Sequence, residues 1–343
     1  MRRIVVRWEA VLFLLIVIST LWSAQLSSDF FTLSNVLDLS SPVIYIGVLA
    51  LGLTPLIIAG DIDISVTSIL AVTAVTCAQL WQHGWSIWLA ALVSLVFATV
   101  LGLINGLIIT VLDVPSLAVT LGALGAYAAI AYVILPGSAI SMPAAFTNVV
   151  DAYWFNNLPV TLPFLLLCIA AFAVLVHWTS FGRYLYIIGS NIESARYTGL
   201  PIRRTKIVAF TLSGFMAGVG GLLYIGYFGS ARADAASLDL LTVVTVVVLG
   251  GINVYGGAGT IAGVALSFVV VAVLENGMQL ANITAPVQAL IIGCLLILAL
   301  AAGRLMRRLG DRARHRTRQQ VDSATIPAAQ APVSEVGSGQ EGG

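Results

Sequence analysis

The feature that most constrains this chain is a series of long apolar segments. Residues 161–178, TLPFLLLCIAAFAVLVHW, contain no acidic residue, lysine or arginine and have the length of a helix that crosses a bilayer. Only 9% of the 343 residues are charged, and the mean hydropathy is +1.01. A soluble domain needs more polar surface than this composition provides. The sequence therefore predicts an all-α, polytopic membrane protein.

Segments of this kind predict about ten transmembrane helices. A short helix at the membrane surface is expected in residues 30–37, which combine apolar and polar side chains. The expected spans are 8–24, 42–59, one ending near residue 80, one ending near residue 110, 116–135, 161–178, 207–227, 240–249, 261–280 and 285–303.

Basic residues predict the orientation of these spans. Arg2, Arg3 and Arg7 precede the first span, a basic loop lies at 179–206, and a further cluster covers 304–318. Positive charges favour the cytoplasmic side, and about ten spans that start inside place all three groups there. Both termini are therefore expected in the cytoplasm.

The end of the chain differs in composition from the rest. Residues 310–343 are rich in alanine, serine, glycine, glutamine and proline, which is typical of disorder. We therefore expect a transmembrane domain over residues 1–309 and a disordered cytoplasmic tail over 310–343.

The loop at 179–206 contains Lys206, the only lysine in the chain. Within it, residues 190–197 predict a short helix that Ser190 or Asn191 caps. Glu193 and Arg196 suit the two ends of its dipole, and Gly199 provides a left-handed stop. This segment is either a docking element for a soluble partner or an ordinary basic cytoplasmic loop.

The sequence lacks a phosphate-binding loop for ATP. Such a loop has the pattern G-x-x-x-x-G-K-[ST], but Lys206 follows Thr205 rather than glycine. If ATP drives a process here, a separate polypeptide must hydrolyse it, and this chain is not expected to be an enzyme.

Two breaks between spans contain polar residues. Asp61, Asp63 and Ser65 follow the second span and either cap the next helix or contribute to a pathway or gate. The glycine-rich segment 250–259 contains Asn253 and forms either a tight turn or an unwound, pathway-lining break.

Three other polar residues are candidates near the outer surface. Glu275 and Asn276 lie in the ninth span, where they contact a polar solute or bond to a neighbouring helix. Arg232, the one basic residue expected outside, either receives an acidic patch of a delivering protein or pairs with Asp234 or Asp239. The scattered cysteines and histidines suggest no metal site, and no cofactor is expected.

Six segments, in this order, are similar to a known family. Together they resemble the ribose/xylose/autoinducer-2 type of ABC-importer permease, and the likeness extends over roughly residues 7–303. Within this family, the sequences of segments 227–237 and 247–259 most resemble those of autoinducer-2 and rhamnose permeases. The six segments are 60–68 (GDIDISVTS), 102–110 (GLINGLIIT), 114–124 (VPSLAVTLGAL), 181–200 (FGRYLYIIGSNIESARYTGL), 246–264 (VVVLGGINVYGGAGTIAGV) and 274–280 (LENGMQL).

The resemblance implies a transmembrane subunit in a bacterial plasma membrane. It implies three partners: a cytoplasmic ATPase, an extracytoplasmic sugar-binding protein, and a second permease, identical or a sister. It also implies alternating access and an ATPase-coupling helix, whose matching residues are Asn191, Glu193, Ser194, Ala195, Arg196 and Gly199. Two residues depart from the family pattern, because Asp61 and Thr67 stand where glycines are usual.

Two other classes of protein compete with this interpretation. A self-contained secondary transporter or channel would need its own ion site, and Glu275 is the candidate within the membrane, without an obvious partner. An intramembrane enzyme would need a cluster of histidines or aspartates, and the scattered histidines argue against it.

Overall fold

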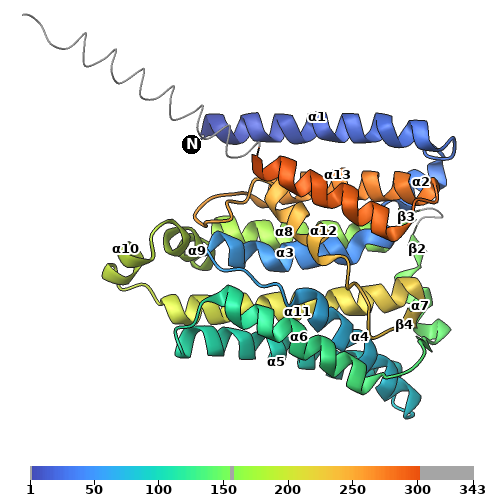
Figure 1. Ribbon diagram of the computed structural model, residues 1–343, viewed down its shortest axis with the longest axis horizontal. Helices are drawn as coiled ribbons and strands as arrows, with labels where there is room; N and C mark the ends of the chain where they lie inside the picture. The colour runs from blue at the N-terminus through green and yellow to red at the C-terminus, as the bar shows by residue number, and fades with distance from the viewer. Residues whose placement is uncertain (1, 155–157, 302–343) are drawn as a thin grey trace, which may run out of the picture. The chain divides into compact units, whose positions relative to one another are not determined.

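The computed structural model describes residues 2–154 and 158–301, with side chains from residue 8 onward. The described chain is helical almost throughout, which confirms the all-α fold (Figure 1). Its helices are α1 (Arg2–Leu26), α2 (Leu33–Asp38), the 3-10 turn η1 (Ser41–Val43), α3 (Ile44–Ile58), α4 (Val66–Gln82), α5 (Ile87–Val111), α6 (Ser116–Ile134), α7 (Ala144–Val150), α8 (Thr161–Trp178), α9 (Ser180–Ser190), α10 (Ile192–Tyr197), α11 (Ile202–Phe228), α12 (Leu240–Leu249), α13 (Ile261–Leu280) and a further apolar helix, Ala285–Ala301.

Seven helical segments of the described chain are long and apolar enough to cross a membrane. They involve α1, α2–α3, α5, α6, α8, α11 and α13. Three shorter apolar helices, α4, α12 and Ala285–Ala301, occupy the positions of the other expected spans. A polytopic membrane protein is therefore confirmed, while the number of ten spans stays a prediction.

Helix α3 lies at the centre of the structure. All of its residues are buried, and it contacts α8, α9, α11, α12 and α13 (Figure 1). Its side chains are apolar apart from Tyr45 and Thr54, whose hydroxyls both donate hydrogen bonds, so the helix can be surrounded in this way without leaving a polar side chain unpaired. Helix α3 thus connects the middle of the bundle to the break at residues 59–65.

Helices α5 and α11 approach each other through glycines. A Cβ atom at Gly102 would lie 2.5 Å from the Phe210 carbonyl oxygen, and one at Gly214 would lie 2.7 Å from that of Ala98. Small residues allow such close backbone contact between membrane helices. The long helix α11 is held in this way against α5, and it also contacts α3 and α4.

Helix α1 packs against α13 and the end of α12. The Trp8 indole Nε1 donates to the Leu249 carbonyl oxygen at 3.0 Å, and the Ser23 hydroxyl donates to that of Val273, also at 3.0 Å. The first described residues of α1 consequently lie at the same end of the bundle as α9 and α10 (Figure 1).

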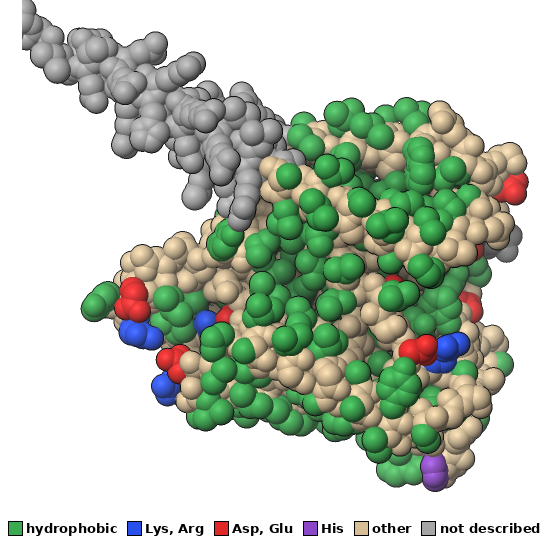
Figure 2. Space-filling model, viewed as in Figure 1, with side chains coloured by type: hydrophobic (Ala, Val, Ile, Leu, Met, Phe, Trp, Pro, Cys, Tyr) green, Lys and Arg blue, Asp and Glu red, His purple; other side chains and the backbone are tan. Residues whose placement is uncertain are grey.

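The segments at the other end form a small cap. Strand β1 (Ile140–Ser141) pairs with β4 (Ser230–Ala231), and β2 (Tyr153–Trp154) pairs with β3 (Leu158–Pro159), both antiparallel. Helix α7 lies beside them (Figure 1). Figure 2 shows the charged side chains of the viewed face near its two ends, with hydrophobic side chains over the middle. This distribution suits a membrane-spanning bundle.

The structure corrects the expected loop at 179–206. Residues 180–190 form α9, and α11 begins at Ile202 rather than at 207. The Thr179 hydroxyl caps α9 by accepting from the Gly182 amide at 3.3 Å. Most of the expected loop is therefore helical. A short helix, α2, forms within the segment 30–37 and one residue beyond it, and its place at the membrane surface stays a prediction. The expected tail, 310–343, lies outside the described residues together with the basic cluster at 304–318.

Candidate coupling site and polar networks

Helix α10 has the capping that the sequence predicts. The Asn191 side chain accepts from the Ser194 amide at 3.0 Å, so Asn191 is the cap. Ser190 instead ends α9 and donates to the Ile187 carbonyl oxygen. Gly199 follows α10 with a φ of +72°, the left-handed conformation expected of it.

One residue anchors α10 while its charged residues face outward. Ala195 is fully buried, whereas Tyr197 is 89% exposed. The Glu193 carboxylate and the Arg196 guanidinium lie 3.6 Å apart, and both side chains are largely exposed. Helix α10 is therefore fixed to the bundle and presents polar and aromatic groups that other proteins could contact.

Glycines join α9 to the core. A Cβ atom at Gly189 would clash with the Ile58 carbonyl oxygen and would lie 2.6 Å from the Gly257 amide nitrogen. The same Ile58 oxygen accepts from the Gly257 amide at 2.8 Å, and the Tyr186 hydroxyl donates to the Gly259 carbonyl oxygen at 2.7 Å. The end of α3, helix α9 and the glycine-rich segment 250–259 consequently meet in direct backbone contact.

Asn253 shapes that glycine-rich segment. Its side-chain amide donates to the Gly256 carbonyl oxygen at 2.7 Å, and its side-chain oxygen accepts from the Tyr255 amide at 3.3 Å. Its backbone amide donates to the Ala258 carbonyl oxygen at 2.9 Å. These bonds form a tight turn, one of the two alternatives that the sequence left open. A role for Asn253 in a solute pathway stays a prediction.

Asp61 forms a partly buried ion pair with Lys206. The Lys206 ammonium lies 2.9 Å from one Asp61 carboxylate oxygen and 3.2 Å from the other. The pair links the break after α3 to the first turns of α11. The sequence singled out both residues but could not pair them, because 145 positions separate them in the chain.

Asp63 is fully buried and accepts three hydrogen bonds. They come from the Ser65 amide at 3.0 Å, the Ser65 hydroxyl at 2.6 Å and the Ser213 hydroxyl of α11 at 3.0 Å. Ser65, the N-cap residue of α4, makes no side-chain capping bond. The side chains of Asp63 and Ser65 thus join the break to α11 instead of capping α4 in the expected way.

The network around Asp63 continues into two further helices. The Asn105 side-chain amide of α5 donates to the Ser65 hydroxyl at 2.9 Å, and the Tyr127 hydroxyl of α6 donates to the Asn105 side-chain oxygen at 2.8 Å. Sequence reasoning gave Asn105 no role and missed Tyr127 and Ser213. A polar residue inside an apolar segment, as Asn105 is, was the available signal.

Asn276 is paired with Asn35 near the end of the bundle opposite α10. Asn35 and Asn276 exchange two amide hydrogen bonds, each 2.9 Å long. Glu275 is buried and lies close to Thr242 of α12, a neighbour that the sequence did not identify. The alternative in which these residues bond to neighbouring helices fits this geometry, and their contact with a solute stays a prediction.

The Asn35–Asn276 pair gives a first quantitative prediction. Single replacement of either residue by leucine removes both bonds of the pair, although Asn35, where it remains, keeps its bond to the Phe30 carbonyl oxygen. A double-mutant cycle is therefore expected to show a coupling energy of about 0.6 kcal/mol, with an upper value of about 1.7 kcal/mol. Unfolding in mild detergent measures it, and additive effects of the two replacements would contradict the pair.

Arg232 is engaged by Asp234 rather than by Asp239. Two hydrogen bonds of 2.9 Å join the Arg232 guanidinium to the Asp234 carboxylate, and they lower the pKa of that carboxyl. Asp239 instead accepts from the Tyr45 hydroxyl at 2.7 Å. The Arg232 and Asp234 side chains are both exposed. Arg232 therefore stays accessible beside strand β4, at the end opposite α10.

The sequence matches, over residues 35–300, the family described as branched-chain amino acid transport system / permease component. The chain belongs to this permease family. This result confirms the resemblance to an importer permease that the ordered sequence segments indicated. The permease is a transmembrane component of an ABC-type import system.

Curated relatives resemble the permease over most of its length. It is 33% identical to the autoinducer 2 import system permease protein LsrD of Salmonella typhimurium, over 84% of this chain and 89% of the relative. It is 34% identical to the protein of the same name from Yersinia pseudotuberculosis, over 85% of this chain and 89% of the relative. No solved structure matches the permease.

Proposed function

We propose that this permease imports a monosaccharide or a sugar-like signal and is coupled through α10 to a separate ATPase. The observation that carries the coupling proposal is the construction of α10. It has a side-chain cap, a buried anchor at Ala195 and exposed charges at Glu193 and Arg196. A helix held so firmly can transmit a movement of the protein bound to it, whereas a freely moving loop could not.

The route from α10 into the membrane supports the same proposal. Through α9 and Gly189, movement of α10 reaches the end of α3 and the turn at 250–259. The break after α3 holds Asp61 and Asp63, which bond to α11. We infer that this break is the inner gate and that its buried bonds rearrange as the two states of alternating access exchange.

The solute would be delivered at the outer end of the helical bundle. Helix α10 and the start of α1 would face the cytoplasm, and the cap near Arg232 would face a sugar-binding protein. Glu275, Asn276 and Asn253 are the further residues proposed along the pathway. The names of the relatives, which state autoinducer 2 import, support autoinducer 2 as the solute. A second permease subunit, identical or a sister, would complete the pathway.

Co-purification tests the partnership. The tagged permease is extracted from native membranes in mild detergent, and bound proteins are identified by mass spectrometry. The proposal expects an ATPase subunit, together with any sister permease. An intact, folded permease that brings down no ATPase under several mild detergents would contradict it.

The docking role of Arg232 gives a second prediction. Replacing Arg232 with glutamate places two acidic side chains at the outer surface, so a binding protein with an acidic patch should dock several-fold more weakly at low salt. High salt should remove most of the difference, because it screens exposed charges. Titration of the binding protein onto the permease in nanodiscs measures this, with Arg232→Gln as the milder variant. Equal affinities at low and high salt would show that the contact does not exist.

A further inference from the structure

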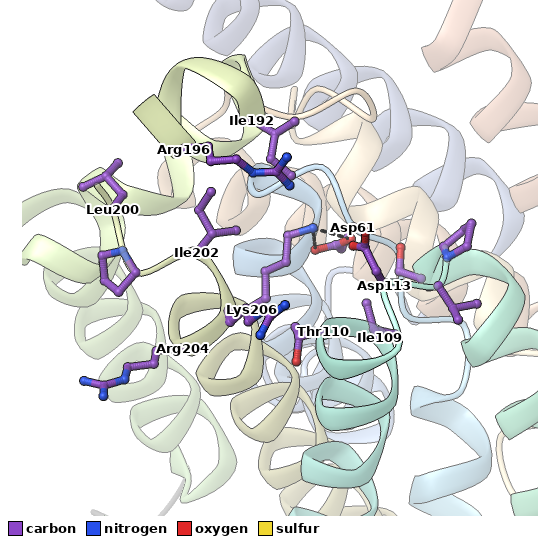
Figure 3. Close-up of a pocket in the computed structure, with 15 residues that line it drawn as sticks. Asp61, Ile109, Thr110, Asp113, Ile192, Arg196, Leu200, Ile202, Arg204 and Lys206 are labelled. Carbon is purple, nitrogen blue, oxygen red and sulfur yellow. Dashed lines mark hydrogen bonds and ion pairs between the residues drawn. The ribbon is translucent and has the colours of Figure 1, made fainter. Parts of the chain in front are cut away.

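An open pocket of about 780 Å³ lies beside α10. It is bounded by the end of α5, the turn into α6, helix α10 and the start of α11 (Figure 3). These are helix ends that belong to the same side of the bundle. The pocket therefore lies at the α10 end of the bundle, beside the ends of α5, α6 and α11, which are long and apolar enough to cross a membrane.

The charged residues that line the pocket are mainly basic. Arg196, Arg203, Arg204 and Lys206 line it, against Asp61 and Asp113. Lys206 forms its ion pair with Asp61 (Figure 3). Arg196 lies 3.6 Å from Glu193, which does not line the pocket. Arg203 and Arg204 then face Asp113, the remaining acidic residue of the lining, so the pocket keeps an excess of positive charge that attracts anions. Arg204 points away from the Asp61–Lys206 pair and lies at the edge of the pocket (Figure 3).

The rest of the pocket continues onto an apolar surface. Its lining includes aliphatic side chains such as Ile109, Val114 and Leu200. Directly beside it, Leu112 and Leu117 are 65% and 52% exposed. An occupant can therefore place an anionic group among the arginines while its apolar part extends along α5 and α6.

We propose that this pocket binds the headgroup of an anionic phospholipid. Basic pockets between transmembrane helices, close to the membrane surface, provide the charge that a lipid phosphate requires. A soluble phosphate compound would use the arginines but would leave the neighbouring aliphatic surface uncovered. The proposal does not depend on the imported solute or on coupling through α10.

Lipid retention by the purified full-length permease tests this proposal. Native mass spectrometry compares phosphatidylglycerol with phosphatidylethanolamine, titrated in equal amounts. We expect at least about threefold preference for phosphatidylglycerol, a free-energy difference of about 0.65 kcal/mol. The double variant Arg203→Gln, Arg204→Gln should lose it. Arg183→Gln, which removes a basic residue of α9 outside the pocket lining, is the matched control and should keep it.

A variant that should bind more lipid separates a specific effect from loss of lipid binding through misfolding. Asp113 lines the pocket with a φ of +54°, a conformation that asparagine tolerates, so Asp113→Asn should preserve the turn and increase phosphatidylglycerol retention. Equal retention of both lipids by the unaltered permease would overturn the proposal. Displacement of the lipid by millimolar inorganic phosphate would also overturn it, because it would show a site for soluble anions.

Discussion

Exchanging the charges of Glu193 and Arg196 is expected to reduce ATP-driven uptake at least about tenfold while the permease still folds. The two side chains are exposed and lie 3.6 Å apart, so Glu193→Arg with Arg196→Glu keeps an ion pair within α10. The exchange does reverse the charges that the helix presents to a partner. Like charges brought together at an interface cost several kcal/mol, and about 1.4 kcal/mol already corresponds to a tenfold effect.

The exchange needs two measurements and a control. Uptake into proteoliposomes and ATP hydrolysis are followed together, and we expect hydrolysis to become independent of solute delivery. The reversed charges oppose the helix dipole by about 0.3–1 kcal/mol each, so thermal unfolding should change little. The same exchange at Arg232 and Asp234, an exposed pair at the other end, should leave ATPase binding intact. Full uptake by the exchanged variant would refute coupling through α10.

Replacing Asp63 with alanine is expected to produce the largest loss of stability. The change removes a fully buried carboxylate that accepts three hydrogen bonds. The Ser65 amide and the hydroxyl groups of Ser65 and Ser213 then lose their acceptor. Each unsatisfied buried group costs about 1–3 kcal/mol, so a total of about 3 kcal/mol or more is expected. Unfolding in mild detergent measures the loss.

Two variants make the Asp63 result specific. Asp63→Asn keeps one acceptor oxygen at nearly the same place and should cost clearly less than the alanine variant. Asp29→Ala removes an exposed carboxylate and should change stability by less than about 0.5 kcal/mol. If Asp63→Ala unfolds like the unaltered permease, the hydrogen bonds around Asp63 do not hold the break in place.

Local sequence patterns predicted the features that depend on neighbouring residues. Uninterrupted apolar segments predicted the long helices, because crossing a bilayer requires both length and apolar character. Asn191 and Gly199 predicted the ends of α10, because capping depends on residues within one turn. The same reasoning missed α9, which is short and lies in a segment where basic residues suggested a loop.

Contacts between distant residues could not be predicted in this way. The Asp61–Lys206 pair spans 145 positions, and the Asn35–Asn276 pair spans 241. Periodicity indicates which residues share a helix face but not which helices become neighbours. For the same reason the sequence assigned no role to Asn105, although it connects the break after α3 to α6.

We expect ATP, and not an ion gradient, to drive uptake through this permease. The deciding experiment follows uptake of labelled autoinducer 2, ribose, xylose and rhamnose by proteoliposomes that contain the permease with its co-purified partners. For an ATP-driven importer, uptake of at least one of these compounds requires hydrolysable ATP and continues after ionophores collapse all ion gradients. Uptake without ATP that ionophores abolish would instead show a secondary transporter and would make Glu275 the first residue to test as an ion site.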